Sequence, residues 1–186
     1  MSVQSVPDIA GLAEHLRGVT VEVTDAGDLL GSGVLWPAGC VVTNAHVVRR
    51  PEATVRLVDG RCLRARVLAR DVDADLALLG VLGTGLAAAT LAEPDTVRIG
   101  SFVAAVGHPY GLRGALSAGI VCAIGPIERN GRPWIQADLR LAPGSSGGPL
   151  ADAAGRIVGV NSRAAGSLAL AVPLSVVARF VETARV

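Results

Sequence analysis

Residues 19–28 read Val19-Thr20-Val21-Glu22-Val23-Thr24-Asp25-Ala26-Gly27-Asp28, an alternating run that ends in a turn. Alternation of this kind is typical of a half-buried strand. Turn signals recur at strand-length intervals further along: Pro37-Ala38-Gly39, Asp59-Gly60, Asn130-Gly131 and Asp152-Ala153-Ala154-Gly155. Asp-Gly and Asn-Gly favour hairpins, because type I′ turns need a positive φ at both central residues. The rhythm predicts about twelve short strands, as in a β-barrel or β-sandwich.

The two ends of the chain have helical spacing instead. Apolar residues at positions 9, 12, 13 and 16 predict a helix for which Asp8 is the N-cap. A second helix is expected after Pro173, since proline suits the first helical turn. Residues 83–100 are rich in Gly, Ala and Thr and predict a connector. The expected order is helix, β-half, connector, β-half, helix.

Composition excludes several classes of protein. The 186 residues are 51% hydrophobic and 18% charged, which excludes intrinsic disorder. A net charge of +1 and only 3% aromatic residues argue against a nucleic-acid partner. The apolar stretches are far shorter than a membrane span, so no membrane partner is expected. Cys40, Cys62 and Cys122 form no C-x-x-C pair, and we expect three small buried side chains rather than a disulfide or metal site.

Residues 1–8 have neither the basic nor the apolar segment of a signal peptide, which predicts a cytoplasmic location. A sequence trimmed from a longer protein would look the same, and a secreted or periplasmic location would then apply.

Three segments carry groups suited to nucleophilic catalysis: 41–48, 71–79 and 142–150. A serine hydroxyl is inert at neutral pH and needs a base, for which His46 is the natural candidate. The imidazole in turn needs a carboxylate to hold its tautomer. The order His, Asp, Ser is that of the chymotrypsin-type fold. On the residues alone, three acids and two serines compete for these roles: Asp71, Asp73, Asp75, Ser145 and Ser146.

Of the three segments, the one containing the loop Gly144-Ser145-Ser146-Gly147-Gly148 is the most specific indicator of nucleophilic catalysis. Gly147 and Gly148 are expected to leave room for a substrate carbonyl beside the nucleophile. Gly144 can adopt a conformation that turns its amide into a concavity. The amides of Gly144 and Ser146 would then form an oxyanion hole.

Thr43-Asn44-Ala45-His46-Val47-Val48, Asp75-Leu76-Ala77-Leu78-Leu79 and the 144–148 loop together resemble the three signatures of the HtrA/Deg family, a branch of the trypsin-like (chymotrypsin-fold) serine proteases. Further matching stretches are Gly31-Ser32-Gly33-Val34, Gly107-His108-Pro109-Tyr110-Gly111, Ser117-Ala118-Gly119-Ile120-Val121, Ile157-Val158-Gly159-Val160-Asn161 and Ala171-Val172-Pro173. The resemblance implies an all-β fold of two perpendicular six-stranded β-barrels with short N- and C-terminal helices. It implies one domain, 1–186, with barrels at about 19–83 and 100–172 and a helix at 173–186.

The resemblance also implies a serine endopeptidase that cleaves unfolded or extended polypeptides through an acyl-enzyme, with no cofactor or metal. Asp75 matches the family acid because it directly precedes an apolar strand, and Ser146 matches the nucleophile because it precedes Gly-Gly. His15 and His108 are interpreted as a helix-face residue and a turn residue. Asn161, Ser162 and Arg163 follow the strand that pairs with substrate in the family, and are predicted to bind substrate.

Substrate preference at P1 has two interpretations. Arg140 lies six residues before the nucleophile, near the base of the S1 pocket in such folds. It could select an acidic P1 residue by a bidentate contact. Alternatively, Arg140 points to solvent or pairs with Asp138 while Leu141 lines a small apolar pocket. The second interpretation is favoured, because the family accepts small aliphatic P1 residues.

Departures from the family pattern leave a rival hypothesis open. These 186 residues contain no counterpart of the family's PDZ domains, and Ser145 stands where relatives commonly have Asn. Many relatives form trimers through N-terminal aromatic residues, and no aromatic precedes Trp36, so the N-terminal segment does not support a trimer. The alternative function is a catalytically silent trypsin-fold scaffold that binds extended peptides.

Overall fold

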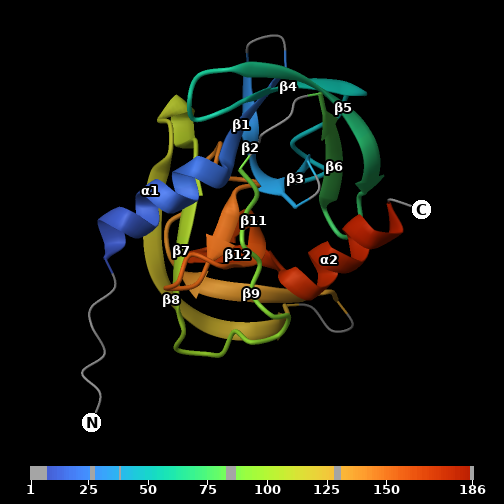
Figure 1. Cartoon of the computed structure of the whole chain (residues 1–186). Coiled ribbons are helices and arrows are strands. Elements are labelled where there is room, and N and C mark those ends of the chain that lie inside the picture. Colours follow the sequence, from blue (N-terminus) through green and yellow to red (C-terminus); the bar gives the residue numbers. More distant parts are fainter. Residues whose placement is uncertain (1–7, 26–27, 38, 83–86, 128–130, 185–186) are drawn as a thin grey trace.

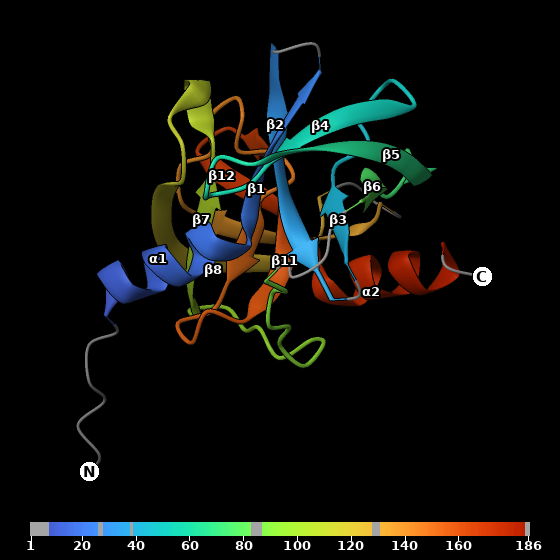
Figure 2. The same cartoon turned by 45° about the horizontal axis from the view of Figure 1, so that its top comes forward.

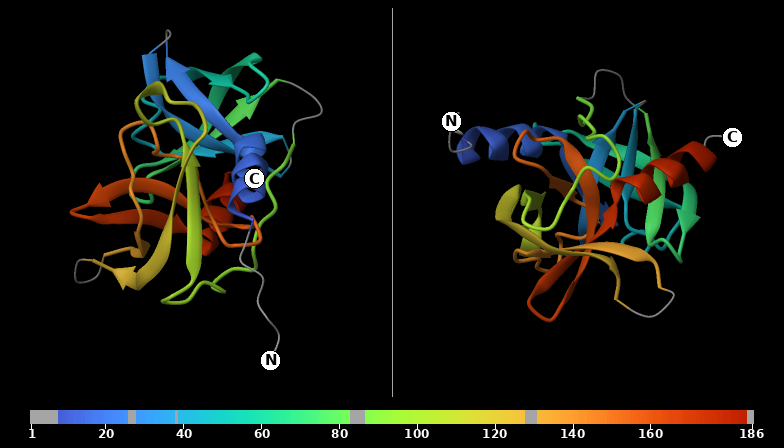
Figure 3. Two further views of the ribbon diagram at one scale, coloured as in Figure 1. Left: turned by 90° about the vertical axis from the view of Figure 1, so that its left-hand side faces the viewer. Right: turned by 90° about the horizontal axis from the view of Figure 1, so that it is seen from below.

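The structure is a computed structural model and describes residues 8–25, 28–37, 39–82, 87–127 and 131–184. These residues form two closed six-stranded β-barrels, with one α-helix before the first barrel and one after the second (Figure 1). In the left view of Figure 3 the first barrel lies above the second. The predicted all-β class with two six-stranded barrels is confirmed.

The first barrel is built from the strands β1 (Thr20–Asp25), β2 (Asp28–Trp36), β3 (Cys40–Thr43), β4 (Glu52–Arg56), β5 (Cys62–Asp71) and β6 (Leu76–Val81). Their order around the barrel is β1-β2-β3-β6-β5-β4, and β4 pairs with β1 to close it. In that pairing Glu22 lies opposite Arg56. The pairing of β3 with β6 sets Thr43 opposite Ala77, so residues just after β3 and just before β6 meet at one rim.

The second barrel repeats the architecture with β7 (Phe102–Gly107), β8 (Ala115–Pro126), β9 (Pro133–Asp138), β10 (Pro149–Ala151), β11 (Ile157–Ala165) and β12 (Leu168–Pro173). The order is β10-β11-β12-β9-β8-β7, closed by β7 on β10. A single 3-10 turn, η1 (Pro109–Gly111), follows β7. The division at 19–83, 100–172 and 173–186 stays a prediction.

Each helix contacts both barrels. α1 (Ile9–Val19) begins at Asp8, whose carboxylate accepts the Gly11 amide at 3.0 Å, as predicted for an N-cap. α1 packs against β1 and β7, and α2 (Leu174–Thr183) packs against β6, β11 and β12. Both helices lie on one side of the molecule (Figures 1 and 2). Neither helix of the described residues has the length and apolar character needed to cross a membrane.

One hydrophobic core spans the two barrels. It contains Val34 and Leu78 of the first barrel, Val106 and Leu170 of the second, and Leu16 of α1, each at most 1% exposed. Because these side chains pack into one cluster, the barrels hold the loops at their junction in a fixed relative position.

Several turn and cysteine predictions can be compared with the structure. Asp59-Gly60 and the turn at 152–155 each join two strands, as predicted. The other three turns include positions 26–27, 38 and 130, outside the described residues. The expectation of three buried cysteines was wrong, because only Cys40 is buried and Cys62 and Cys122 are exposed. The last two sit on β5 and β8, whose outward faces meet solvent.

Candidate active site

His46 and Asp75 meet at the rim of the first barrel. His46 follows β3 and Asp75 precedes β6, so the β3–β6 register brings them together. The His46 Nδ1 atom lies 2.9 Å from Oδ1 and 3.0 Å from Oδ2 of Asp75, and the His46 amide donates to Oδ1 at 3.1 Å. Since an ionised carboxylate only accepts hydrogen bonds, Nδ1 carries the hydrogen and Nε2 is left as the basic nitrogen.

Asp75 is held from three directions. Its backbone has a φ of 54°, and its carbonyl accepts the Asn44 side-chain amide at 2.9 Å. The Ser162 hydroxyl donates to its Oδ2 at 2.6 Å. Burial works to raise the pKa of Asp75, but the hydrogen bonds from His46 and Ser162 outweigh it and hold the pKa below its usual value. The group is therefore a carboxylate at neutral pH.

Ser146 lies in the loop before β10 and reaches the same place from the second barrel. Its hydroxyl donates to the carbonyl oxygen of Ser162 at 2.7 Å. Among the described residues, no hydrogen bond joins the Ser146 hydroxyl to His46. Ser162, which is 0% exposed, therefore contacts both Ser146 and Asp75 and gathers the three predicted residues at the junction of the barrels.

The loop ahead of Ser146 leaves two amides without an acceptor. The Pro143 carbonyl accepts the Tyr110 amide at 2.9 Å. Because C=O and N–H of a trans peptide point in opposite directions, the Gly144 N–H faces away from Tyr110. Gly144 has a φ of 102°, in the region that glycine reaches readily. Neither the Gly144 amide nor the Ser146 amide donates to another described residue.

The two glycines after Ser146 have a different role from the one expected. A Cβ on Gly147 would overlap the Ser32 carbonyl and the Thr43 hydroxyl, and one on Gly148 would overlap the Val106 carbonyl. Both positions thus face the strands beneath the loop and not the space beside the nucleophile. The absence of side chains lets the loop lie directly on both barrels.

A buried polar chain supports Gly144, and the sequence did not indicate it. The Ser32 hydroxyl donates to the Gly144 carbonyl at 2.7 Å and accepts the His108 amide at 3.1 Å. The His108 Nδ1 atom is also 3.1 Å from Ser32 Oγ. Since the Ser32 hydrogen is used on Gly144, Nδ1 is the donor in this contact. The one available signal was a serine between two glycines in a strand, Gly31-Ser32-Gly33.

His108 lies at the start of the η1 turn, in agreement with its interpretation as a turn residue, and it is only 6% exposed. Burial lowers the pKa of His108; Glu22 opposes this effect and Arg113 adds to it. The imidazole is therefore neutral at neutral pH.

The candidate S1 pocket has a volume of about 250 Å³ and lies beside the 142–146 loop. Leu141, Arg140 and Ser145 line it together with Ser117, whose hydroxyl accepts the Arg140 amide at 3.0 Å. No ion pair joins Arg140 to Asp138 within the described part of the chain. Arg140 is an exposed residue at the wall of this mainly apolar pocket, with Leu141 beside it.

The three residues predicted to bind substrate differ in exposure. Arg163 is exposed, and its guanidinium carbon lies 5.1 Å from the Trp134 ring centre. Together with Arg132, it lines a cavity of about 670 Å³. The side chains of Asn161 and Ser162 are 0% exposed. The Asn161 amide donates to the Pro149 carbonyl at 2.6 Å, so this side chain holds the loop instead of facing a ligand.

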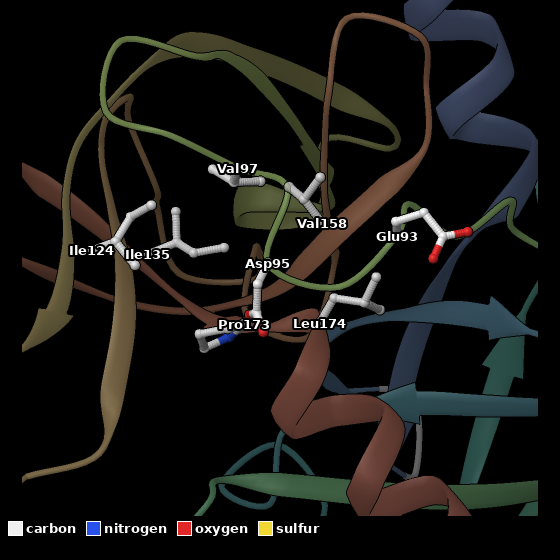
Figure 4. Close-up of a pocket in the computed structure, with 8 residues that line it drawn as sticks. All are labelled: Glu93, Asp95, Val97, Ile124, Ile135, Val158, Pro173 and Leu174. Atoms are coloured by element: carbon white, nitrogen blue, oxygen red, sulfur yellow. The ribbon is translucent and has the colours of Figure 1, made fainter.

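A separate apolar pocket of about 270 Å³ lies away from these residues (Figure 4). Its walls include Ile124, Ile135 and Val158, and the connector contributes Glu93 and Asp95. None of His46, Asp75 and Ser146 lines it. No group of three or more potential metal ligands occurs in the described parts of the chain.

Comparisons with known proteins agree with this geometry. A family model described as "Trypsin-like peptidase domain" matches residues 31–160. The "Probable periplasmic serine endoprotease DegP-like" of Pseudomonas savastanoi pv. phaseolicola is 36% identical, over 93% of this chain and 41% of its own length. The protein of the same name from Halomonas elongata is 39% identical, over 79% of this chain and 33% of its own length. The chain therefore spans less than half the length of these relatives.

Among solved structures, "HtrA-type protease AlgW with decapeptide" matches with a TM-score of 0.86 and 25% identity, over 94% of this chain and 66% of that one. The names of the curated relatives contradict the predicted cytoplasmic location, since those proteins are described as periplasmic. That prediction depended on residues 1–8, and a sequence that covers under half of its relatives does not support it.

Proposed function

The chain belongs to the family of trypsin-like peptidase domains, as an HtrA-like member, and we propose that it is a serine endopeptidase acting on extended polypeptides. Its catalytic residues are His46, Asp75 and Ser146, with the amides of Gly144 and Ser146 as the oxyanion hole. The observation that carries this proposal is the convergence on Ser162, whose hydroxyl binds Asp75 and whose carbonyl binds Ser146.

In the proposed reaction Ser146 first rotates about its Cα–Cβ bond, from the Ser162 carbonyl toward Nε2 of His46. Its oxygen attacks the substrate carbonyl carbon, and the proton passes to Nε2. The oxyanion accepts hydrogen bonds from the amides of Gly144 and Ser146, while the Asp75 carboxylate stabilises the imidazolium. His46 then protonates the leaving amine as the C–N bond breaks. Water, deprotonated by His46, hydrolyses the acyl-enzyme and restores the Ser146 hydroxyl.

An extended peptide would add as a strand beside β11, which carries Arg163 at its exposed end. Its P1 side chain would enter the pocket beside Leu141. The mainly apolar walls favour aliphatic P1 residues. A solved relative contains a decapeptide, which supports polypeptide substrates.

One observation favours the silent scaffold as a second candidate: the Ser146 hydroxyl is engaged by Ser162 instead of His46. A fluorophosphonate probe separates the two functions, because it reacts only with an activated serine. We expect labelling at Ser146, loss of labelling in His46→Ala, and casein cleavage that falls by about 10⁶-fold in Ser146→Ala. Peptide binding without labelling, in the presence or absence of added peptide, would establish the scaffold.

A further inference from the structure

A cavity of about 90 Å³ lies between the two barrels on the side of α1 and is lined by an unusual set of charges. Arg17 comes from α1, Glu22 from β1, Arg56 from β4 and Arg113 from the segment after η1. His108 completes the polar wall. The volume exceeds what one water molecule needs.

The wall carries more positive than negative charge. Glu22 is the only carboxylate among the residues that line the cavity, and its Oε2 lies 3.4 Å from Arg56 Nε and 3.5 Å from Arg113 Nε. Arg17 bonds outward through its terminal nitrogen to the exposed Glu14 at 3.0 Å. Even with Glu14 counted, three guanidinium groups face two carboxylates. An anion entering the cavity would meet this excess of positive charge.

Three buried polar atoms at this wall make no hydrogen bond with a described residue: the Nε donors of Arg17 and Arg56 and the Oε2 acceptor of Glu22. The last two lie within ion-pair distance of each other, at 3.4 Å, without the geometry of a hydrogen bond. Glu22 is 9% exposed, so solvent contributes little to its oxygen. Buried polar groups are nearly always paired, and each exception needs a physical reason. Here two donors and one acceptor around the same space lack a hydrogen bond.

We propose that this cavity binds a hydrogen phosphate group, either as free inorganic phosphate or as the end of a phosphomonoester. Its deprotonated oxygens accept the Nε hydrogens of Arg17 and Arg56 and pair with the Arg113 guanidinium, which also lines the cavity. Its one P–OH donates to Oε2 of Glu22. Sulfate matches the size and charge but has no hydrogen to donate at neutral pH. Glu22 therefore acts as the selective group, because it repels an oxyanion that cannot donate.

The site adjoins the support of Gly144. His108 stands in the cavity wall, and its amide and Nδ1 are both 3.1 Å from Ser32 Oγ, which in turn binds the Gly144 carbonyl. A phosphate group in the cavity would thus lie against the residue that holds this polar chain in place.

The test measures binding to the catalytically inactive Ser146→Ala chain, so it does not depend on the proposed function. Inorganic phosphate, O-phosphoserine and sulfate are titrated calorimetrically at matched ionic strength and neutral pH. We expect one-to-one binding of inorganic phosphate, tighter than that of sulfate. O-phosphoserine binding as well would identify the phosphomonoester end as the group accepted, and its failure would restrict the site to the free ion.

Variants assign the binding to this cavity. Arg56→Gln and Arg113→Gln should each weaken phosphate binding by about tenfold to a hundredfold, the range for one charged hydrogen bond or ion contact. Arg179→Gln on α2, which does not line the cavity, is the matched control and should bind as the parent does. Glu22→Gln should narrow the preference for phosphate over sulfate, because the new amide can donate to sulfate.

Two results would overturn the proposal. One is phosphate binding no tighter than sulfate or chloride in the parent chain. The other is unchanged affinity in Arg113→Gln, whose side chain is 61% exposed and can be replaced without disturbing the core. This second variant keeps the test decisive if Arg56→Gln does not fold.

Discussion

The carbonyl oxygen of Ser162 accepts the hydroxyl hydrogen of Ser146 at 2.7 Å. The hydroxyl of the same Ser162 donates to Asp75 at 2.6 Å. One residue of β11 therefore contacts the proposed nucleophile through its backbone and the proposed orienting carboxylate through its side chain. The two contacts are separable by mutation, since a change of side chain leaves the carbonyl in place.

Ser162→Ala removes only the hydroxyl contact to Asp75. The pKa of Asp75 should rise, because a hydrogen bond to its charged form is lost. We expect kcat to fall about tenfold with little change in KM, the effect of one hydrogen bond to a charged group. Steady-state kinetics on a peptide substrate measure this. Ser101→Ala, at a distant partly exposed serine, should keep wild-type kinetics; equal activity in the two variants would show that Ser162 does not position Asp75.

His108 should make the fold sensitive to mild acid. Its pKa is lowered in the folded state from 6.5, mainly by burial. As pH falls below 6.5, the unfolded chain takes up a proton that the folded chain does not, so stability falls until the folded pKa is reached. The loss is at most about 1.4 kcal/mol per pH unit. Urea unfolding from pH 7.5 to 5 (roughly one unit either side of a free histidine) should show a flatter profile for His108→Asn. His15→Asn, on the exposed face of α1, should retain the wild-type slope.

Gly147→Ala should destabilise the protein by about 2–4 kcal/mol, through backbone strain together with overlap. Gly147 has a φ of 87°, and its Cβ would overlap the Ser32 carbonyl. Gly60→Ala is the control, since Gly60 has a φ of 89° with open space around it and should lose only about 1 kcal/mol. Unfolding free energies of the two variants separate strain from overlap. Equal losses would mean that the loop moves to accommodate the methyl group.

Arg140 should contribute little to the choice of P1 residue. The candidate S1 pocket is mainly apolar and Leu141 shares its wall, so peptides with Val at P1 should be cleaved at least about tenfold faster than those with Glu. Arg140→Ala should leave kcat/KM for the Val peptide nearly unchanged. A preference for Glu that disappears in Arg140→Ala would instead establish the acidic-P1 interpretation.

Features that depend on neighbouring residues, such as strands and turns, could be predicted from the sequence. Alternating runs and turn residues predicted two β-halves, and the β3–β6 pairing explains why His46 and Asp75, 29 residues apart, share a hydrogen bond. The hydrogen bonds that hold the Gly144 loop between the two barrels could not be predicted from local patterns. Ser32 and His108 meet across 76 residues and two barrels, a contact that depends on how the barrels pack.

The sequence does not show which neighbours a position will face, and this explains the wrong predictions for the two glycines and the two cysteines. Gly147 and Gly148 were expected to leave room for the substrate. Their missing side chains instead leave room for the backbone carbonyls of Ser32 and Val106 in the strands beneath the loop. Cys62 and Cys122 lie in strand-like runs, but the sequence does not state which face of a barrel strand meets solvent. The prediction that Asn161 and Ser162 bind substrate concerns strand pairing along β11 and stays a prediction, while their side chains turn inward to the loop and to Asp75.

The division of the site between two barrels has a consequence for biosynthesis. His46 and Asp75 belong to the half of the chain that leaves the ribosome first, and Ser146 and Ser162 belong to the half that leaves last. A nascent polypeptide therefore carries a proton acceptor with no nucleophile until β10 and β11 have been translated and the second barrel has docked. The proposed triad is therefore incomplete until the second barrel has folded against the first.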